Sequence, residues 1–182
     1  MDINDKSFAD CLATEWEPPN ALNPTHWVVK ASTLEEKENF RKQERMRYAL
    51  PHKPFTYCMH GYYSIVGRVK GIYHHNAGSE PPKGRVHSLL IPNRPNFITM
   101  TVLVTDAVAR LPNGKGTRAD ICTLLQDSQF IQEGVNKDSL SSSVSKALDK
   151  IQDDDDPPVK YYPKRREWLY LHRARTESVF GK

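Results

Sequence analysis

The sequence predicts an α+β fold in which three helices precede a β-hairpin, and three observations in its C-terminal half predict it. Apolar residues recur with a period near 3.6 over residues 97–111 and again over residues 140–151, which is typical of amphipathic helices. Thr117 and Asp120 stand between those segments at the spacing of a helix capping box. Two β-prone runs joined by a polar turn then close this half. Three helices followed by a hairpin is the order of a winged helix.

Length and composition limit the class of protein. The chain has 182 residues, 38% hydrophobic and 26% charged, so it can hold one generous domain or two small ones. No apolar run approaches the ~18 residues that suggest a membrane span. Cys11, Cys58 and Cys122 are odd in number and widely separated, which favours a reducing compartment over a disulfide framework. We expect an intracellular protein without membrane contact.

The predicted organisation has a winged helix as its larger part and an N-terminal extension packing on it. The boundaries expected are residues 1–23 for a mobile lead-in, 24–93 for the extension with a surface loop over 74–87, 94–172 for the winged helix and 173–182 for a C-terminal tail.

The extension is predicted to begin with a polar helix. Thr33 and Glu36 form a capping box, and the helix runs to about Tyr48 because Pro51 cannot follow within it. Phe40 is nearly its only interior apolar residue, while charged residues cover the other faces. Such a helix is exposed in isolation, and we expect it to be held by i,i+4 ion pairs or by a partner.

The second part of the extension is predicted to be short strands. Residues 55–73 are rich in aromatic and β-branched side chains and are interrupted by glycines. The helix predicted over residues 97–111 is apolar on more than one side, because Ile98 and Val102 lie off its main stripe. We expect the strand segment to cover that second side.

Local signals delimit the helices of the winged helix. Pro95 suits a first helical turn, and residues 112–114, Pro-Asn-Gly, end the first helix. Thr117 opens the second helix, and Asn136 or Asp138 can cap the third, which stops before residues 157–158, Pro-Pro.

The hairpin is predicted to comprise residues 159–162 and 168–171. We expect the Leu169 and Leu171 face to pack on the third helix, since alternate residues of a strand share a face. The predicted core is Leu103, Val104, Leu124, Leu140, Val144, Leu148, Trp168, Leu169 and Leu171.

The hairpin, or wing, is the first candidate binding site. Cations interleaved with aromatic side chains can contact phosphate, and a solvated turn that protects an edge strand explains the same residues equally well. The candidates for nucleic-acid or partner contact are Lys160, Tyr162, Lys164, Arg165 and Arg166.

The third helix is not expected to read DNA bases. Residues 94–172 hold eleven cations and eleven carboxylates, whereas a DNA-binding domain usually has a basic excess. Four carboxylates follow the helix, and they would repel phosphate. These acidic residues, Asp153, Asp154, Asp155 and Asp156, are candidates for contact with a basic partner, or else a solvated run.

No pattern of catalytic residues emerges, and we expect no enzyme, cofactor or small-molecule substrate. Residues 114–117, Gly-Lys-Gly-Thr, lack the spacing of a phosphate loop, and a short strand or turn explains them better. Cys58, His60, His74 and His75 lack paired zinc-ligand spacing, so we expect no metal.

Four runs carry a specific family resemblance. They are RYALPHKPFTYCMHGYYSIVGRVKGIY (47–73), RPNF (94–97), ARLPNGKGTRADICTLLQDSQFI (109–131) and ALDKIQDDDDPPVKYYPKRREWLYLHR (147–173). In the same order, they resemble the second winged-helix region of the family of nuclear factors related to kappa-B-binding protein, with the segment leading into it. The resemblance covers about residues 24–180. Since members carry further domains before this region, we expect this chain to be a fragment, a partial gene model or a shortened relative.

The resemblance implies a nuclear, non-ATPase accessory subunit of an INO-eighty-type chromatin-remodelling complex. We therefore expect a non-catalytic interaction module in the nucleus, serving transcription regulation and DNA repair through the complex. Its expected partners are other subunits, with weak non-specific DNA contact. The helix over 97–111 and residues 55–73 are expected to form the docking platform. The alternative is a winged-helix transcription factor that binds DNA.

Overall fold

A computed structural model describes residues 29–59, 62–70 and 86–180. In this part of the chain the helices are α2 (Leu34–Ala49), α3 (Met100–Ala109), the 3-10 turn η2 (Pro112–Gly114), α4 (Arg118–Leu125), α5 (Lys137–Gln152) and α6 (Glu177–Phe180). The strands are β1 (Phe55–Met59), β2 (Tyr62–Val66), β3 (Lys115–Gly116), β4 (Val159–Tyr162) and β5 (Glu167–Tyr170).

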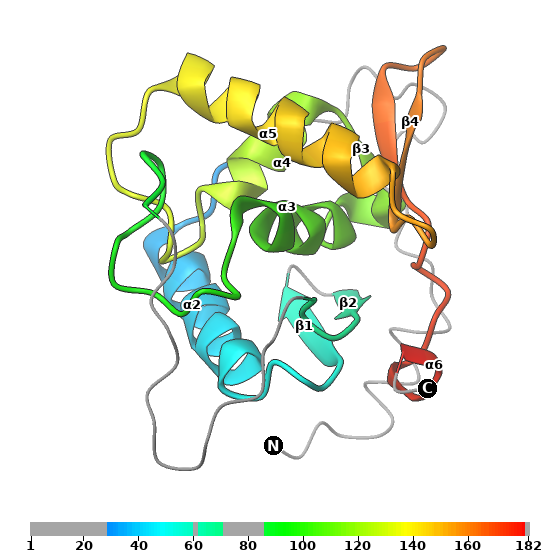
Figure 1. The fold of residues 1–182 in the computed structure, drawn as a ribbon, viewed down its shortest axis with the longest axis horizontal. Helices are drawn as coiled ribbons and strands as arrows, with labels where there is room; N and C mark the ends of the chain where they lie inside the picture. The colour runs from blue at the N-terminus through cyan, green and yellow to red at the C-terminus, as the bar shows by residue number, and fades with distance from the viewer. Residues whose placement is uncertain (1–28, 60–61, 71–85, 181–182) are drawn as a thin grey trace.

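Helix α3 lies at the centre of the fold. Helices α4 and α5 pack on one side of it and β1–β2 with α2 on the other, as Figure 1 shows. Antiparallel β1 and β2 form one small sheet, and β3, β5 and β4 form a second in that order. Helices α3, α4 and α5 with the second sheet form the predicted winged helix, so the predicted α+β class and fold are confirmed.

The helix starts depend on side-chain caps. Thr33 and Thr117 form the predicted capping boxes with Glu36 and Asp120, and Asn136 caps α5. The predicted start of the first winged-helix helix is wrong. Thr99, and not a residue near Pro95, caps α3, because its hydroxyl accepts the Val102 N–H.

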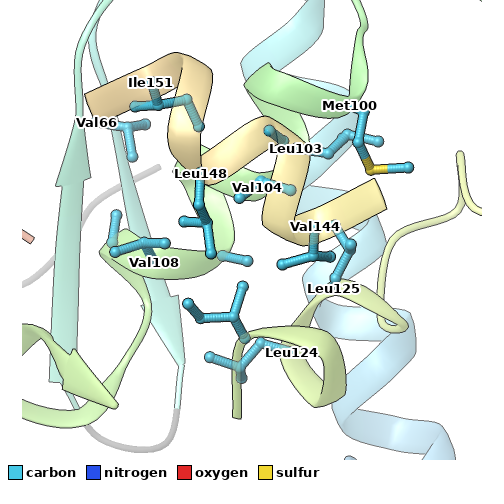
Figure 2. Close-up of a cluster of buried hydrophobic side chains, with 14 of the residues drawn as sticks. Val66, Met100, Leu103, Val104, Val108, Leu124, Leu125, Val144, Leu148 and Ile151 are labelled. Carbon is cyan, nitrogen blue, oxygen red and sulfur yellow. The ribbon is translucent and has the colours of Figure 1, made fainter. Parts of the chain in front are cut away.

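One hydrophobic core joins the extension to the winged helix. Figure 2 shows Val66 of β2 in the same cluster as Val104 and Val108 of α3 and Leu148 of α5. Ile98 is fully covered and Val102 partly covered. The prediction that the strand segment packs over this helix is confirmed.

Helix α2 is held by contacts with the rest of its own chain. Its inner side buries Phe40 and Tyr48 and also the polar residues Gln43, Glu44 and Arg47. The Gln43 amide donates to the Cys58 carbonyl at 2.8 Å and accepts the Cys58 N–H at 2.7 Å, so it occupies part of the open edge of β1. The partner that holds α2 is therefore another part of the same chain.

The orientation of the wing strands corrects part of the predicted core. Trp168 and Tyr170 face inward with Val159, while Leu171 is 46% exposed and Leu169 only partly buried. Side chains of β5 alternate between its two faces as predicted, but the face that packs on the helices is the one with Trp168 and Tyr170 and not the one with Leu169 and Leu171. Tyr161 and Trp168 pack ring to ring at 4.9 Å, and the Tyr170 hydroxyl donates to the Ile65 carbonyl at 2.7 Å. The other seven predicted core residues are buried.

Candidate interaction surfaces

The wing turn projects its cations into solvent. Lys164, Arg165 and Arg166 are all exposed, and Arg166 has a left-handed backbone, with φ of 53°. Two backbone hydrogen bonds hold the turn: the Arg165 N–H donates to the Tyr162 carbonyl, and the Arg166 N–H to the Pro163 carbonyl, both at 3.2 Å. The turn is thus a defined structure that presents three charges close together.

The sheet beside the turn has a basic outer side. Leu169 of β5 is the direct neighbour of Lys115 on β3 and of Lys160 on β4, so these side chains form a row across the sheet. Tyr162, which is 42% exposed, and Leu171 lie on the same side by alternation. We call Lys115, Lys160, Tyr162, Leu169 and Leu171 the outer wing face.

The exposed side of α5 is close to neutral. Its exposed cations are Lys137, Lys146 and Lys150, and its exposed carboxylates are Asp138, Asp149 and the C-cap Asp153. A phosphate backbone would therefore meet as many negative as positive charges along this helix.

The acidic run after α5 is partly engaged within the chain. Asp154 accepts from the Lys70 ammonium at 2.6 Å. Both Asp156 oxygens pair with the Arg175 guanidinium at 2.8 Å, and one lies 3.3 Å from His172 Nε2. The hydrogen bond from Arg175 lowers the pKa of Asp156 to about 2. Asp153 and Asp155 remain exposed and are the acidic candidates best placed for a partner.

A buried polar cluster lies around Asp106 in α3. Its carboxylate accepts from the Arg47 Nε at 2.7 Å, the Tyr48 hydroxyl at 2.9 Å and the Tyr57 hydroxyl at 2.8 Å. Burial raises the pKa of both tyrosines well above their ordinary value, and the charge of Asp106 adds to this, so both remain neutral donors. For Arg47, burial is the largest single influence and lowers the pKa, but Asp106, Tyr57 and Tyr48 together outweigh it and raise the pKa.

A second buried carboxylate, Glu44, ties α2 to the segment after α4. It accepts from the Ser128 hydroxyl at 2.6 Å, the Gln129 N–H at 3.0 Å and the Gln129 amide at 3.1 Å. Burial raises the pKa of Glu44, and these hydrogen bonds oppose the rise. Both buried carboxylates thus join elements of the fold.

Comparison with known proteins identifies the family. The family model described as NFRKB second winged helix domain matches residues 36–178. The chain belongs to this family. It is 46% identical over 180 residues to nuclear factor related to kappa-B-binding protein of Xenopus tropicalis, and this match covers 99% of the chain. The chain spans 14% of the length of that curated relative. No solved structure matches it significantly.

The described residues of this NFRKB-type domain form neither a metal site nor a membrane-spanning helix. Among the described residues, no three His, Cys, Asp or Glu side chains gather so that they could hold a metal ion. His60, His74 and His75 lie outside the described residues. In the part of the chain that the structure describes, none of the helices combines the length and apolar character needed to cross a membrane.

The helical part of the predicted docking platform is wrong, because helix α3 is buried along nearly its whole length. Strands β1 and β2 use their inward side chains to cover α3, and docking through their partly exposed outward side chains stays a prediction. The Asp106 cluster was not predicted from the sequence. A carboxylate in the middle of a helix predicted to be buried on two sides was the available signal, but nothing local indicated Arg47, Tyr48 and Tyr57 as its partners.

Proposed function

We propose that this chain is a non-catalytic protein-interaction module of a nuclear chromatin-remodelling complex of the INO-eighty type. It would act in transcription regulation and DNA repair through that complex. Membership of the NFRKB second winged helix domain family supports the proposal, as does the relative's name, which describes a nuclear factor.

The balanced charge of α5 is the observation that carries the proposal. A winged helix that reads DNA places this helix in the major groove, against two phosphate backbones. Three exposed lysines against three exposed carboxylates on and at the end of α5 give that position no electrostatic attraction. The surface suits protein contact better than base recognition.

The alternative, a DNA-binding transcription factor, has one observation in its favour. The wing turn presents Lys164, Arg165 and Arg166 to solvent without a neighbouring exposed carboxylate on β4 or β5. Such a turn can contact phosphates whatever the base sequence. We therefore include weak, non-specific DNA contact by the wing in the proposal.

Cross-linking mass spectrometry on nuclear complexes purified through the tagged full chain tests the proposal. The expected result is cross-links from exposed lysines of the chain, such as Lys137, Lys146 and Lys160, to subunits of a remodelling ATPase complex. The matched control is the same preparation after nuclease treatment, which removes contacts that run through DNA. Cross-links that persist after nuclease treatment support the proposed protein-interaction module. Loss of all remodeller cross-links on nuclease treatment would support the DNA-binding alternative.

A further inference from the structure

The outer wing face combines positive charge with uncovered apolar surface. Lys115, Lys160 and the exposed turn cations surround Leu169, Leu171 and Tyr162. Its one carboxylate, Glu167, is buried. Exposed apolar side chains clustered within a charged surface are typical of a site where another segment docks.

The chemistry of this face favours one class of occupant. A phosphate backbone would match the cations but would leave the leucines and the tyrosine ring without an apolar partner. A peptide segment that alternates carboxylates with large apolar side chains would match both features at once.

The chain itself contains such a segment near its N-terminus. Residues 1–28 hold five carboxylates, at Asp2, Asp5, Asp10, Glu15 and Glu17, and one lysine. Three large apolar residues, Phe8, Leu12 and Trp16, recur at intervals of four, the spacing that places side chains on one side of a helix. Residues 2–17 are therefore acidic and hold three large apolar residues at helical spacing.

The chain also enters the described structure beside the wing sheet. The Val29 N–H donates to Asp120 Oδ1 at 3.3 Å, and the same carboxylate accepts the Thr117 N–H at 3.0 Å, directly after β3. Strand β3 is an edge of the three-stranded sheet. Neighbouring strands lie ~4.8 Å apart, so the two outer strands of this sheet are roughly 10 Å apart. The twelve residue-to-residue steps from Glu17 to Val29 can span up to about 40 Å. The acidic segment can thus reach every part of the outer wing face.

We propose that residues 2–17 dock on the outer wing face, with their carboxylates toward the wing cations and Phe8, Leu12 and Trp16 over Leu169 and Leu171. A short tether holds the segment at an effective concentration on the order of mM, so a contact of only mM affinity is about half occupied. The docked segment would shield the wing cations from phosphate. This inference concerns the isolated chain and is independent of assembly into a remodelling complex.

Paramagnetic relaxation enhancement in the full chain tests the docking. A nitroxide on native Cys11, in a Cys58→Ser, Cys122→Ala background with an unchanged amide spectrum, reports which amides the segment approaches. The expected result is loss of signal intensity at Lys160, Leu169 and Leu171. Raising the salt to 1 M, where the Debye length is about 3 Å, should restore part of that intensity.

Two charge-reversal variants separate docking on the wing from general attraction. The wing variant should abolish the broadening, and it combines Lys160→Glu, Lys164→Glu and Arg165→Glu. Its matched control reverses three exposed cations in and after α2, as Lys42→Glu, Arg45→Glu, Lys53→Glu, and should leave the broadening unchanged. Broadening that is absent, that is spread over the surface, or that follows the α2 variant instead would overturn the proposal. Equal broadening of an isotope-labelled chain by a separate nitroxide-labelled chain would also overturn it, because the contact would then lie between two copies.

Hydrogen exchange of chains that keep all their cysteines provides a second readout if the background spectrum changes. Residues 2–17 should exchange faster in the wing variant than in the unsubstituted chain or the α2 variant. Equal exchange in all three chains would contradict the docking.

Discussion

Arg47 of α2 and Asp106 of α3 form a two-bonded ion pair in the interior, with Nε–Oδ2 at 2.7 Å and Nη2–Oδ1 at 3.1 Å. Their side chains are 3% and 4% exposed. The pair, with the Tyr48 and Tyr57 hydroxyls, holds the polar helix of the extension on the central helix of the winged helix. It joins residues 59 positions apart in sequence.

Removing the carboxylate of this pair should be strongly destabilising. Asp106→Ala leaves a buried guanidinium and two buried hydroxyls without their acceptor, so we expect a loss of about 3–5 kcal/mol in the free energy of unfolding. Denaturant titration measures it. The control, Asp154→Ala, breaks the exposed pair with Lys70 and should cost no more than about 1 kcal/mol. An equal loss in both variants would contradict a structural role for the buried pair.

Replacing both partners should recover much of that stability. Arg47→Met with Asp106→Leu removes both charges together, and buried pairs exchanged for apolar residues are often neutral or stabilising. The two tyrosine hydroxyls still lose their acceptor, so we expect partial recovery. If the double variant were less stable than Asp106→Ala alone, the prediction would be wrong, because the cost of Asp106→Ala would then not come from leaving the Arg47 charge buried without a partner.

Glu44 should make stability depend on pH. Burial raises its pKa above 4.5 in the folded chain, so between the unfolded and folded pKa values only the folded state holds the proton. The free energy of unfolding therefore falls as the pH rises through that window, by up to about 1.4 kcal/mol per pH unit. Glu44→Gln should remove this slope in melts from pH 4.5 upward. Glu38→Gln, on the exposed side of the same helix, should retain it, and a slope unchanged by Glu44→Gln would refute the assignment.

The orientation of β5 predicts opposite effects for two leucines. Leu148 of α5 is 0% exposed, and Leu148→Ala should cost about 2–5 kcal/mol. Leu171→Ala, on the outer wing face, should change stability by no more than ~0.5 kcal/mol, as surface substitutions usually do. Thermal and denaturant unfolding compare the two. A large loss from Leu171→Ala would mean that Leu171 belongs to the folded core, and it would contradict this orientation of β5.

The shared core predicts that the extension and the winged helix are one folding unit. A chain shortened to begin at Arg94 loses the cover that Tyr57 and Val66 give to α3, and the acceptor that Ile65 gives to Tyr170. We expect lower solubility and a lower melting temperature than for the whole chain. Equal values for the two chains would favour two independent units.

Isolated DNA binding should be weak, indifferent to sequence and carried by the wing turn. Three phosphate contacts give a slope of log K against log salt near −3, with affinity in the micromolar range or weaker. A triple variant of the wing turn should flatten that slope in fluorescence-anisotropy titrations with two unrelated duplexes. It combines Lys164→Ala, Arg165→Ala and Arg166→Ala. Lys146→Ala, Lys150→Ala is the control on α5 and should change it little. Nanomolar binding at physiological salt that prefers one duplex and needs Lys146 would favour the transcription factor.

The sequence by itself determined the features that depend on neighbours along the chain. Thr33 with Glu36 and Thr117 with Asp120 start helices because a cap needs only residues three positions apart. The stripe of α5 from Leu140 to Ile151 and the turn between β4 and β5 are equally local. These elements, in this order, were enough to predict the winged helix.

Only the tertiary structure decided which side of β5 faces inward and what the polar helix α2 packs on. Strand alternation groups Leu169 with Leu171 but does not say which group is buried, and Trp168 and Tyr170 gain ring packing and a hydrogen-bond acceptor on the inner side. Glu44 and Arg47 appear in the sequence as surface charges. They can be buried because Ser128 and Gln129 donate to Glu44 and Asp106 accepts from Arg47. Pairing across 59 to 85 residues leaves no trace in local periodicity.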